Sequence, residues 1–188
     1  MDEVDQRVLA IRKLQIVRQF ASQDREPCEV LPGLFIGPIG AARNLESLQK
    51  SGITYVLNAS PVIPCFHRKH LRYKKVLVYD DPDEEISRYF DESNRFIHKA
   101  RKKGGVLVHC FAGQSRSATL VAAYLISCEG LDALAALNLI RKTRPSAQPN
   151  TGFIRQLRTY SQKLDGAGLP RRLEDGMGDP ARDTVHCM

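Results

Sequence analysis

A cysteine and an arginine stand six residues apart, between a run of apolar residues and a helical segment. The stretch VLVHCFAGQSRS spans 106–117 and places Cys110 behind the apolar run and Arg116 near the helix start. Backbone N–H groups of such a loop, together with the positive end of the helix, can point at one anion. Arg116 can curl back and hold two oxygens of an oxyanion as a fork. The same field favours the thiolate of Cys110, so the spacing predicts a nucleophile beside an oxyanion site.

A lone cysteine at a strand end is usually an inert core residue. Cys110 is not alone, because His109 precedes it and Gly113, Arg116 and Ser117 follow at short offsets. Gly113 also permits the backbone angles that a tight loop between strand and helix demands. We therefore interpret the stretch as a reactive site.

These residues resemble the signature of the protein tyrosine phosphatase superfamily, H-C-x5-R-[S/T]. HCFAGQSRS is similar to the dual-specificity branch of that superfamily, where H-C-x-x-G-x-S-R-S is usual. The resemblance continues in PGLFIG, ITYVLNAS, the helical segment 89–97 and RPSAQPNTGFIRQL, and covers about 28–164. It implies a dual-specificity protein phosphatase of the small atypical or plant-like kind.

The resemblance also implies roles for the residues of the loop. Cys110 would attack phosphorus and form a phosphocysteine that water then hydrolyses. Ser117 would help the thiolate leave in the second step, and His109 would tune the thiolate through hydrogen bonds of the loop. Ordinary packing remains the alternative for both. The implied phosphate-binding residues are Phe111, Ala112, Gly113, Gln114, Ser115 and Arg116.

An acidic loop, YDDPDEE at 79–85, offers candidates for the proton donor that a leaving alkoxide or phenolate needs. Asp80 stands nine residues before Tyr89, which is the spacing of the family's catalytic aspartate. Asp81 is the second candidate, and a solvated acidic turn is the alternative to both. Asn150, in PNTGF, matches a family asparagine that supports the active-site loop, and it also suits a helix N-cap.

Short β-rich runs alternate with helical patterns along the middle of the chain. This alternation predicts an α/β fold with a central, mainly parallel sheet of about 4–5 strands flanked by helices, as in protein tyrosine phosphatases. The expected strands are 33–37, 53–57, 75–79 and 106–109, and the expected helices lie near 40–50, 85–103, 116–129, 131–143 and 151–164.

Three parts follow from this pattern. Residues 1–27 are predicted to form an extra N-terminal helix and a linker, and 28–164 the catalytic domain. Residues 165–188 are rich in glycine, proline and charge, which predicts a flexible C-terminal tail.

The composition limits where the protein is expected to act and what it is expected to bind. No apolar run approaches the roughly 18 residues of a spanning helix, so we expect no membrane segment. Five scattered cysteines favour a reducing compartment, which predicts a cytoplasmic and also a nuclear location. The net charge of +7 suits anionic partners, but no nucleic-acid motif accompanies it. Cys65, His67 and His70 lack a second ligand cluster, and we expect neither a metal nor a cofactor.

Phosphorylated proteins are the expected substrates, at phosphotyrosine and at phosphoserine or phosphothreonine, and the resemblance suggests MAP kinases. Members of the resembled family that act on phosphoinositides often carry basic residues in this loop, whereas residues 111–115 carry no lysine, so the resemblance disfavours phosphoinositides. The open alternatives are a phosphoinositide, RNA 5′-phosphate or phosphoglucan phosphatase, and a phosphoprotein-binding module with weak turnover.

Two segments outside the loop could contact protein partners. The basic stretch 67–75 could dock an acidic partner. The N-terminal helix could bind calmodulin or a kinase, or it could pack on the domain.

Overall fold

The computed structural model of the chain describes residues 24–166. The predicted N-terminal helix lies outside these residues, as does the predicted tail apart from its first two positions. Those two positions belong to the last helix, which ends at Gly166. No helix of the described part is long and apolar enough to cross a membrane.

A five-stranded sheet forms the centre of the fold, in the order β1-β2-β5-β3-β4. The strands are β1 (Cys28–Leu31), β2 (Leu34–Gly37), β3 (Ile53–Asn58), β4 (Arg72–Lys75) and β5 (Gly105–His109). β1 pairs with β2 antiparallel, and every other pairing is parallel. The expected α/β fold with a mainly parallel sheet is therefore confirmed.

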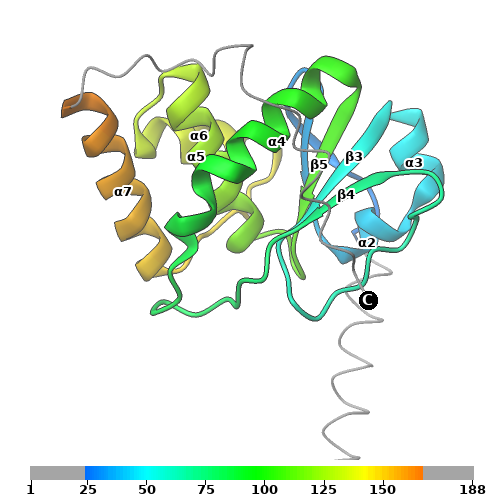
Figure 1. The fold of residues 1–188 in the computed structure, drawn as a ribbon, viewed down its shortest axis with the longest axis horizontal. Coiled ribbons are helices and arrows are strands. Elements are labelled where there is room, and N and C mark those ends of the chain that lie inside the picture. The colour runs from blue at the N-terminus through cyan, green and yellow to red at the C-terminus, as the bar shows by residue number, and fades with distance from the viewer. Residues whose placement is uncertain (1–23, 167–188) are drawn as a thin grey trace, which may run out of the picture.

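Helices cover both faces of this sheet (Figure 1). α2 (Ile39–Arg43) and α3 (Leu45–Lys50) lie on one side. On the other lie α4 (Phe90–Lys103), α5 (Arg116–Glu129), α6 (Ala133–Thr143) and α7 (Thr151–Gly166), with the short 3-10 helix η1 (Ile86–Tyr89) leading into α4.

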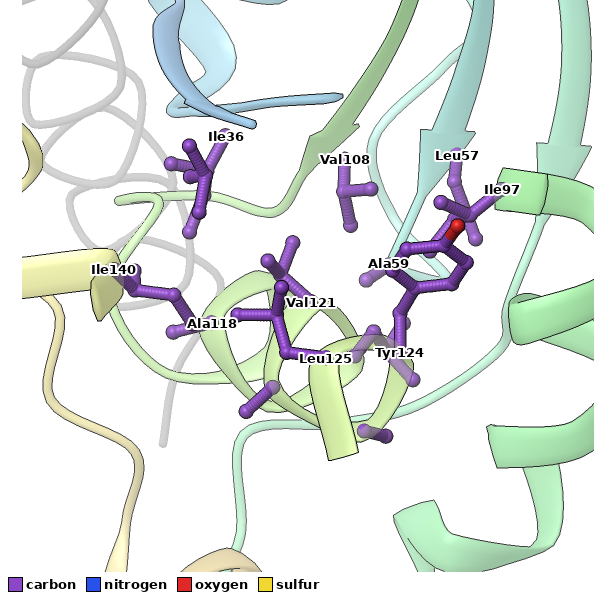
Figure 2. Close-up of a cluster of buried hydrophobic side chains, with 14 of the residues drawn as sticks. Ile36, Leu57, Ala59, Ile97, Val108, Ala118, Val121, Tyr124, Leu125 and Ile140 are labelled. Atoms are coloured by element: carbon purple, nitrogen blue, oxygen red, sulfur yellow. The ribbon is translucent and has the colours of Figure 1, made fainter. Parts of the chain in front are cut away.

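The strand side chains alternate between two hydrophobic cores, as the period of a β-strand requires. Ile36, Leu57 and Val108 belong to the larger core, and Figure 2 shows them facing Val121 and Leu125 of α5. The side chains next to them in sequence, such as Phe35, Val56 and Leu107, pack in the smaller core on the other face. The central strand β5 is buried throughout and apolar up to its last residue, His109, so it fixes the start of the loop that follows it.

One strand was predicted in the wrong place, and one strand was not predicted. The run expected as a strand at 75–79 is β4 only at Lys75, because β3 ends at Asn58 and offers no partner beyond it. The alternation in that run is real, since Val76 and Val78 are fully buried and Leu77 and Tyr79 are about half exposed. β1 was not predicted, because four residues interrupted by Glu29 form too short a pattern and the strand is stabilised by pairing with β2.

Candidate active site

Three segments that are distant in sequence line one cavity of about 480 Å³ at the carboxyl end of β5. The β5–α5 loop (110–115) contributes Cys110, and α5 contributes Arg116. The acidic loop contributes Asp80, and the connection before α7 contributes Asn150. Parallel α/β sheets place their sites at this edge, because the loops after neighbouring strands converge there.

Gly113 gives the β5–α5 loop its shape. Its φ of 66° lies in the left-handed region. A Cβ at this position would come within 2.6 Å of the carbonyl of Gly37, so the loop lies directly on the connection between β2 and α2. The backbone N–H of Ile39 donates to the carbonyl of Phe111 at 3.0 Å across the same contact.

Cys110 follows β5 and is almost fully buried, with 1% of its surface exposed. Its Sγ lies 3.3 Å from the Oγ of Ser117, in the first turn of α5. Since the N-terminus of a helix carries unpaired N–H groups and partial positive charge, an anion bound in this part of the cavity would be stabilised. The structure thus brings together Cys110, Ser117 and the helix end, as the sequence suggested.

Arg116 reaches across the cavity toward the segment after β4. Its guanidinium is largely buried, and Nη1 donates to the carbonyl of Val78 at 3.4 Å. Nε lies 3.8 Å from Oδ2 of Asp80 and has no acceptor among residues 24–166. A buried donor on a cation without an acceptor is rare, and it leaves hydrogen-bonding capacity for an anion in this cavity.

Asp80 and Asp81 have different surroundings. Oδ1 of Asp80 accepts from Oγ of Ser115 at 2.6 Å and from Nδ2 of Asn150 at 3.0 Å. Asp81 does not line the cavity, and its Oδ1 accepts from the N–H of Asp83 in a local turn. Of the two candidates for proton donor, only Asp80 is placed beside Cys110 and Arg116.

Asn150 both caps a helix and contacts the loops that line the cavity. Its Oδ1 accepts from the N–H of Phe153 at 2.9 Å and so caps α7. Its Nδ2 holds Asp80, and its N–H donates to Oγ of Ser115 at 3.2 Å. One asparagine therefore links the acidic loop, the β5–α5 loop and α7.

His109 lies behind the cavity and not in it. It is fully buried at the end of β5, and burial is the main cause that lowers its pKa to about 4, with the charge of Arg116 adding to the effect. A neutral imidazole with a carbonyl 3.3 Å from Nδ1 must donate to it, so His109 donates to the carbonyl of Cys110. His109 thus contacts the backbone at Cys110, the first residue of the β5–α5 loop.

Arg144, which the sequence interpretation missed, does not line the cavity but supports the β5–α5 loop through two backbone carbonyls. It is buried, its Nε donates to the carbonyl of Gly113 at 2.7 Å, and its Nη2 donates to that of Ala112 at 2.8 Å. Nη2 also pairs with Asp24 at 2.7 Å. With these carbonyls of the loop drawn toward Arg144, N–H groups of the loop can face the cavity. An arginine at the end of a helix carries no sequence signal for such a contact.

The remaining loop residues divide by position. Phe111, Ala112, Gln114 and Ser115 line the cavity, whereas Gly113 lies against the β2–α2 connection. Among residues 24–166, no group of three or more histidine, cysteine or acidic side chains could hold a metal ion.

Comparison with known proteins identifies this arrangement. The family model described as dual specificity phosphatase, catalytic domain, matches residues 34–163. The chain belongs to the dual specificity phosphatase family. This dual specificity phosphatase is therefore a protein tyrosine/serine/threonine phosphatase, which confirms the family and activity expected from the sequence.

Individual relatives agree with the family. Dual specificity protein phosphatase 1 of Arabidopsis thaliana is 37% identical over 155 residues, covering 82% of this chain and 78% of the relative. MAP kinase phosphatase with leucine-rich repeats protein 3 of Dictyostelium discoideum is 42% identical over 139 residues, covering 73% of this chain but 16% of the relative. The crystal structure of human DUSP28 is similar with a TM-score of 0.71 and 34% identity, covering 74% of this chain and 95% of that one.

Proposed function

We propose that this dual specificity phosphatase hydrolyses phosphoproteins through a phosphocysteine on Cys110. In the first step the thiolate attacks phosphorus, the bond to the ester oxygen breaks, and that oxygen takes a proton from Asp80. In the second step water attacks phosphorus and gives a proton to the Asp80 carboxylate. The bond between sulfur and phosphorus then breaks, with Ser117 donating to the departing thiolate, and inorganic phosphate leaves.

Nε of Arg116, which forms a long ion pair with Asp80 but has no hydrogen-bond acceptor within residues 24–166, carries this proposal. It lines the same cavity as Cys110 and retains a buried donor without an acceptor among the described residues. An arginine placed next to a nucleophile in this way stabilises the charge that develops on phosphoryl oxygens in the transition state. The backbone N–H groups of the β5–α5 loop add to that stabilisation.

The charge of the cavity supports a protein substrate with a single phosphate at the site. Among the described residues that line it, Arg116 is the one cation. A phosphoinositide headgroup with several phosphates would need further cations there. MAP kinases are the substrate class that we propose within phosphoproteins, supported by the name of the Dictyostelium relative.

We also propose that the protein acts in the cytoplasm or nucleus. Within residues 24–166, Cys28, Cys65, Cys110 and Cys128 form no disulfide, which suits a reducing compartment.

Substrate trapping tests the proposal. Cys110→Ser should abolish hydrolysis of an aryl phosphate and of phosphotyrosine and phosphothreonine peptides, and should retain phosphoproteins from a lysate. Cys128→Ser is the matched control, because it changes another cysteine, on α5 and outside the residues that line the cavity. This variant should hydrolyse the same substrates as fast as the wild type. Undiminished hydrolysis by Cys110→Ser would refute the mechanism. Faster turnover of phosphoinositides, RNA 5′-phosphates or phosphoglucans than of phosphopeptides would refute the substrate class.

A further inference from the structure

The acidic loop has little protein packed around it. Val78 before it and Ile86 after it are fully buried, but Asp80, Asp81, Pro82 and other side chains between them are exposed. A second cavity of about 510 Å³ lies along the seam between this loop and α7, with Pro82 and Asp83 on one side and Gly152 and Gln156 on the other. The loop must therefore be fixed by specific contacts, because no continuous core supports it. Figure 1 shows it at the N-terminal end of α7.

Gln156 makes two of these contacts with one side chain. Its Nε2 donates to the carbonyl of Glu84 at 2.9 Å, and its Oε1 accepts from the N–H of Ser87 at 2.9 Å. The side-chain amide thus bridges a carbonyl and an N–H three residues apart, and both bonds are partly buried. The bridge fixes the place where the acidic loop enters η1.

Gly152 makes the third contact through the absence of a side chain. A Cβ at this position would lie 1.7 Å from the carbonyl oxygen of Pro82 and 2.5 Å from its carbon. The backbone of the acidic loop therefore lies against the first turn of α7 at a distance that only glycine allows. Pro82 is two residues from Asp80, so this contact restricts where the backbone can place Asp80 in the cavity lining.

We propose that Gln156 and Gly152 are positioning residues that hold Asp80 at the leaving-group oxygen of the substrate. This inference rests on the proposed function, in which Asp80 is the general acid. Asn150 holds the Asp80 carboxylate itself, Gly152 admits the backbone at Pro82, and Gln156 fixes the far end at Glu84 and Ser87. The first two turns of α7 thus act as one platform for the acid.

The dependence on leaving group separates positioning from a general loss of structure. An ester with a strongly acidic leaving group departs without a proton, whereas phenyl phosphate and phosphoserine need one. A displaced acid therefore slows only the second kind of substrate. The parameter to compare is kcat/KM, which covers the steps through cleavage of the ester bond.

We expect Gln156→Ala to lower kcat/KM about tenfold or more for phenyl phosphate, and less than about twofold for a polyfluorinated aryl phosphate, since a general acid contributes roughly 10²–10⁴-fold. Gly152→Ala should show the same selective loss, because it must displace Pro82. Arg158→Ala, an exposed change on the same helix, should behave like the wild type with both esters. Gln156→Glu, which keeps the acceptor and loses the donor, should show the loss if the alanine variant is unstable.

Asp80→Asn, measured in parallel, distinguishes the two possible failures. If Asp80→Asn loses activity equally with both esters, the proposed acid is wrong. If Asp80→Asn shows the leaving-group dependence but folded Gln156 and Gly152 variants do not, the positioning role of α7 is overturned.

Discussion

The hydroxyl of Ser117 lies 3.3 Å from the sulfur of Cys110, where the proposed mechanism would return charge to sulfur when the phosphocysteine is hydrolysed. A hydrogen bond to a charged group is worth about 1.5–3 kcal/mol, so Ser117→Ala should lower kcat by about tenfold or more. The value of kcat/KM should change little, because the first step does not need this donor. Stopped-flow kinetics with an aryl phosphate should show a burst of one phenolate per enzyme followed by slow turnover. Equal losses in kcat and kcat/KM would contradict this role.

His109 should make the stability of the domain depend on pH. Its pKa of about 4 in the folded state lies below the 6.5 of the unfolded side chain, so between these pH values the unfolded state binds the extra proton. The free energy of unfolding should therefore fall as pH decreases from about 6.5 to about 4, by about 3 kcal/mol from this residue. In His109→Asn, which can still donate to the carbonyl of Cys110, this part of the slope should disappear.

Urea denaturation at about pH 6.5 and about pH 5 measures this effect, since about half of the pH range of the shift lies between them. The wild type should lose more stability than His109→Asn on this acidification. An identical change in the two proteins would show that His109 does not carry a depressed pKa.

At the scale of elements, the packing of the β5–α5 loop against the β2–α2 connection predicts different results for two glycines with the same backbone angle. Gly113 and Gly52 both have φ of 66°, but a Cβ at Gly52 would meet nothing within 4 Å, whereas at Gly113 it would meet Gly37 at 2.6 Å. Gly52→Ala should cost about 1–2 kcal/mol in unfolding free energy and preserve activity. Gly113→Ala should cost more and abolish phosphatase activity, because the loop must leave its place. Equal activity in the two folded variants would contradict this account of the loop.

The helices and strands whose bounds were predicted best are those in which the sequence pattern agrees with the observed burial. Helices near 116–129 and 151–164 and the strand before Cys110 were predicted closely, since most of their apolar residues pack in a core. β4 was misplaced because the alternation of 75–79 continues after β3 has ended, and pairing is a property of two strands. The same limit applies to the site. The spacing predicted Cys110 and Arg116, and the family resemblance added Asp80. The contacts of Arg144, Gly152 and Gln156 join segments far apart in sequence and leave no local pattern.

The whole molecule carries a net charge of +7, and the exposed Arg68, Lys69 and Arg72 lie before and on the edge strand β4. A positive field accelerates the encounter with anionic partners and is screened by salt within about 10 Å at 0.1 M. We expect kcat/KM for an acidic phosphopeptide to fall about threefold or more between low and physiological salt. The value for a small aryl phosphate should fall less. A variant with glutamate at 68, 69 and 72 should lose most of the salt dependence for the peptide, and an unchanged dependence would argue against this surface.

β4 is the outermost strand of the sheet on its side, and within residues 24–166 no strand pairs with its free edge. An open edge of this kind invites the corresponding strand of another molecule, which is how many β-proteins begin to aggregate. Three of the four residues of β4 are Arg72, Lys74 and Lys75, so two such edges would bring like charges together. Arg72, which we expect to help attract phosphorylated partners, therefore also helps to keep copies of the protein apart, and neutralising the cations of β4 should cost solubility before it costs catalysis.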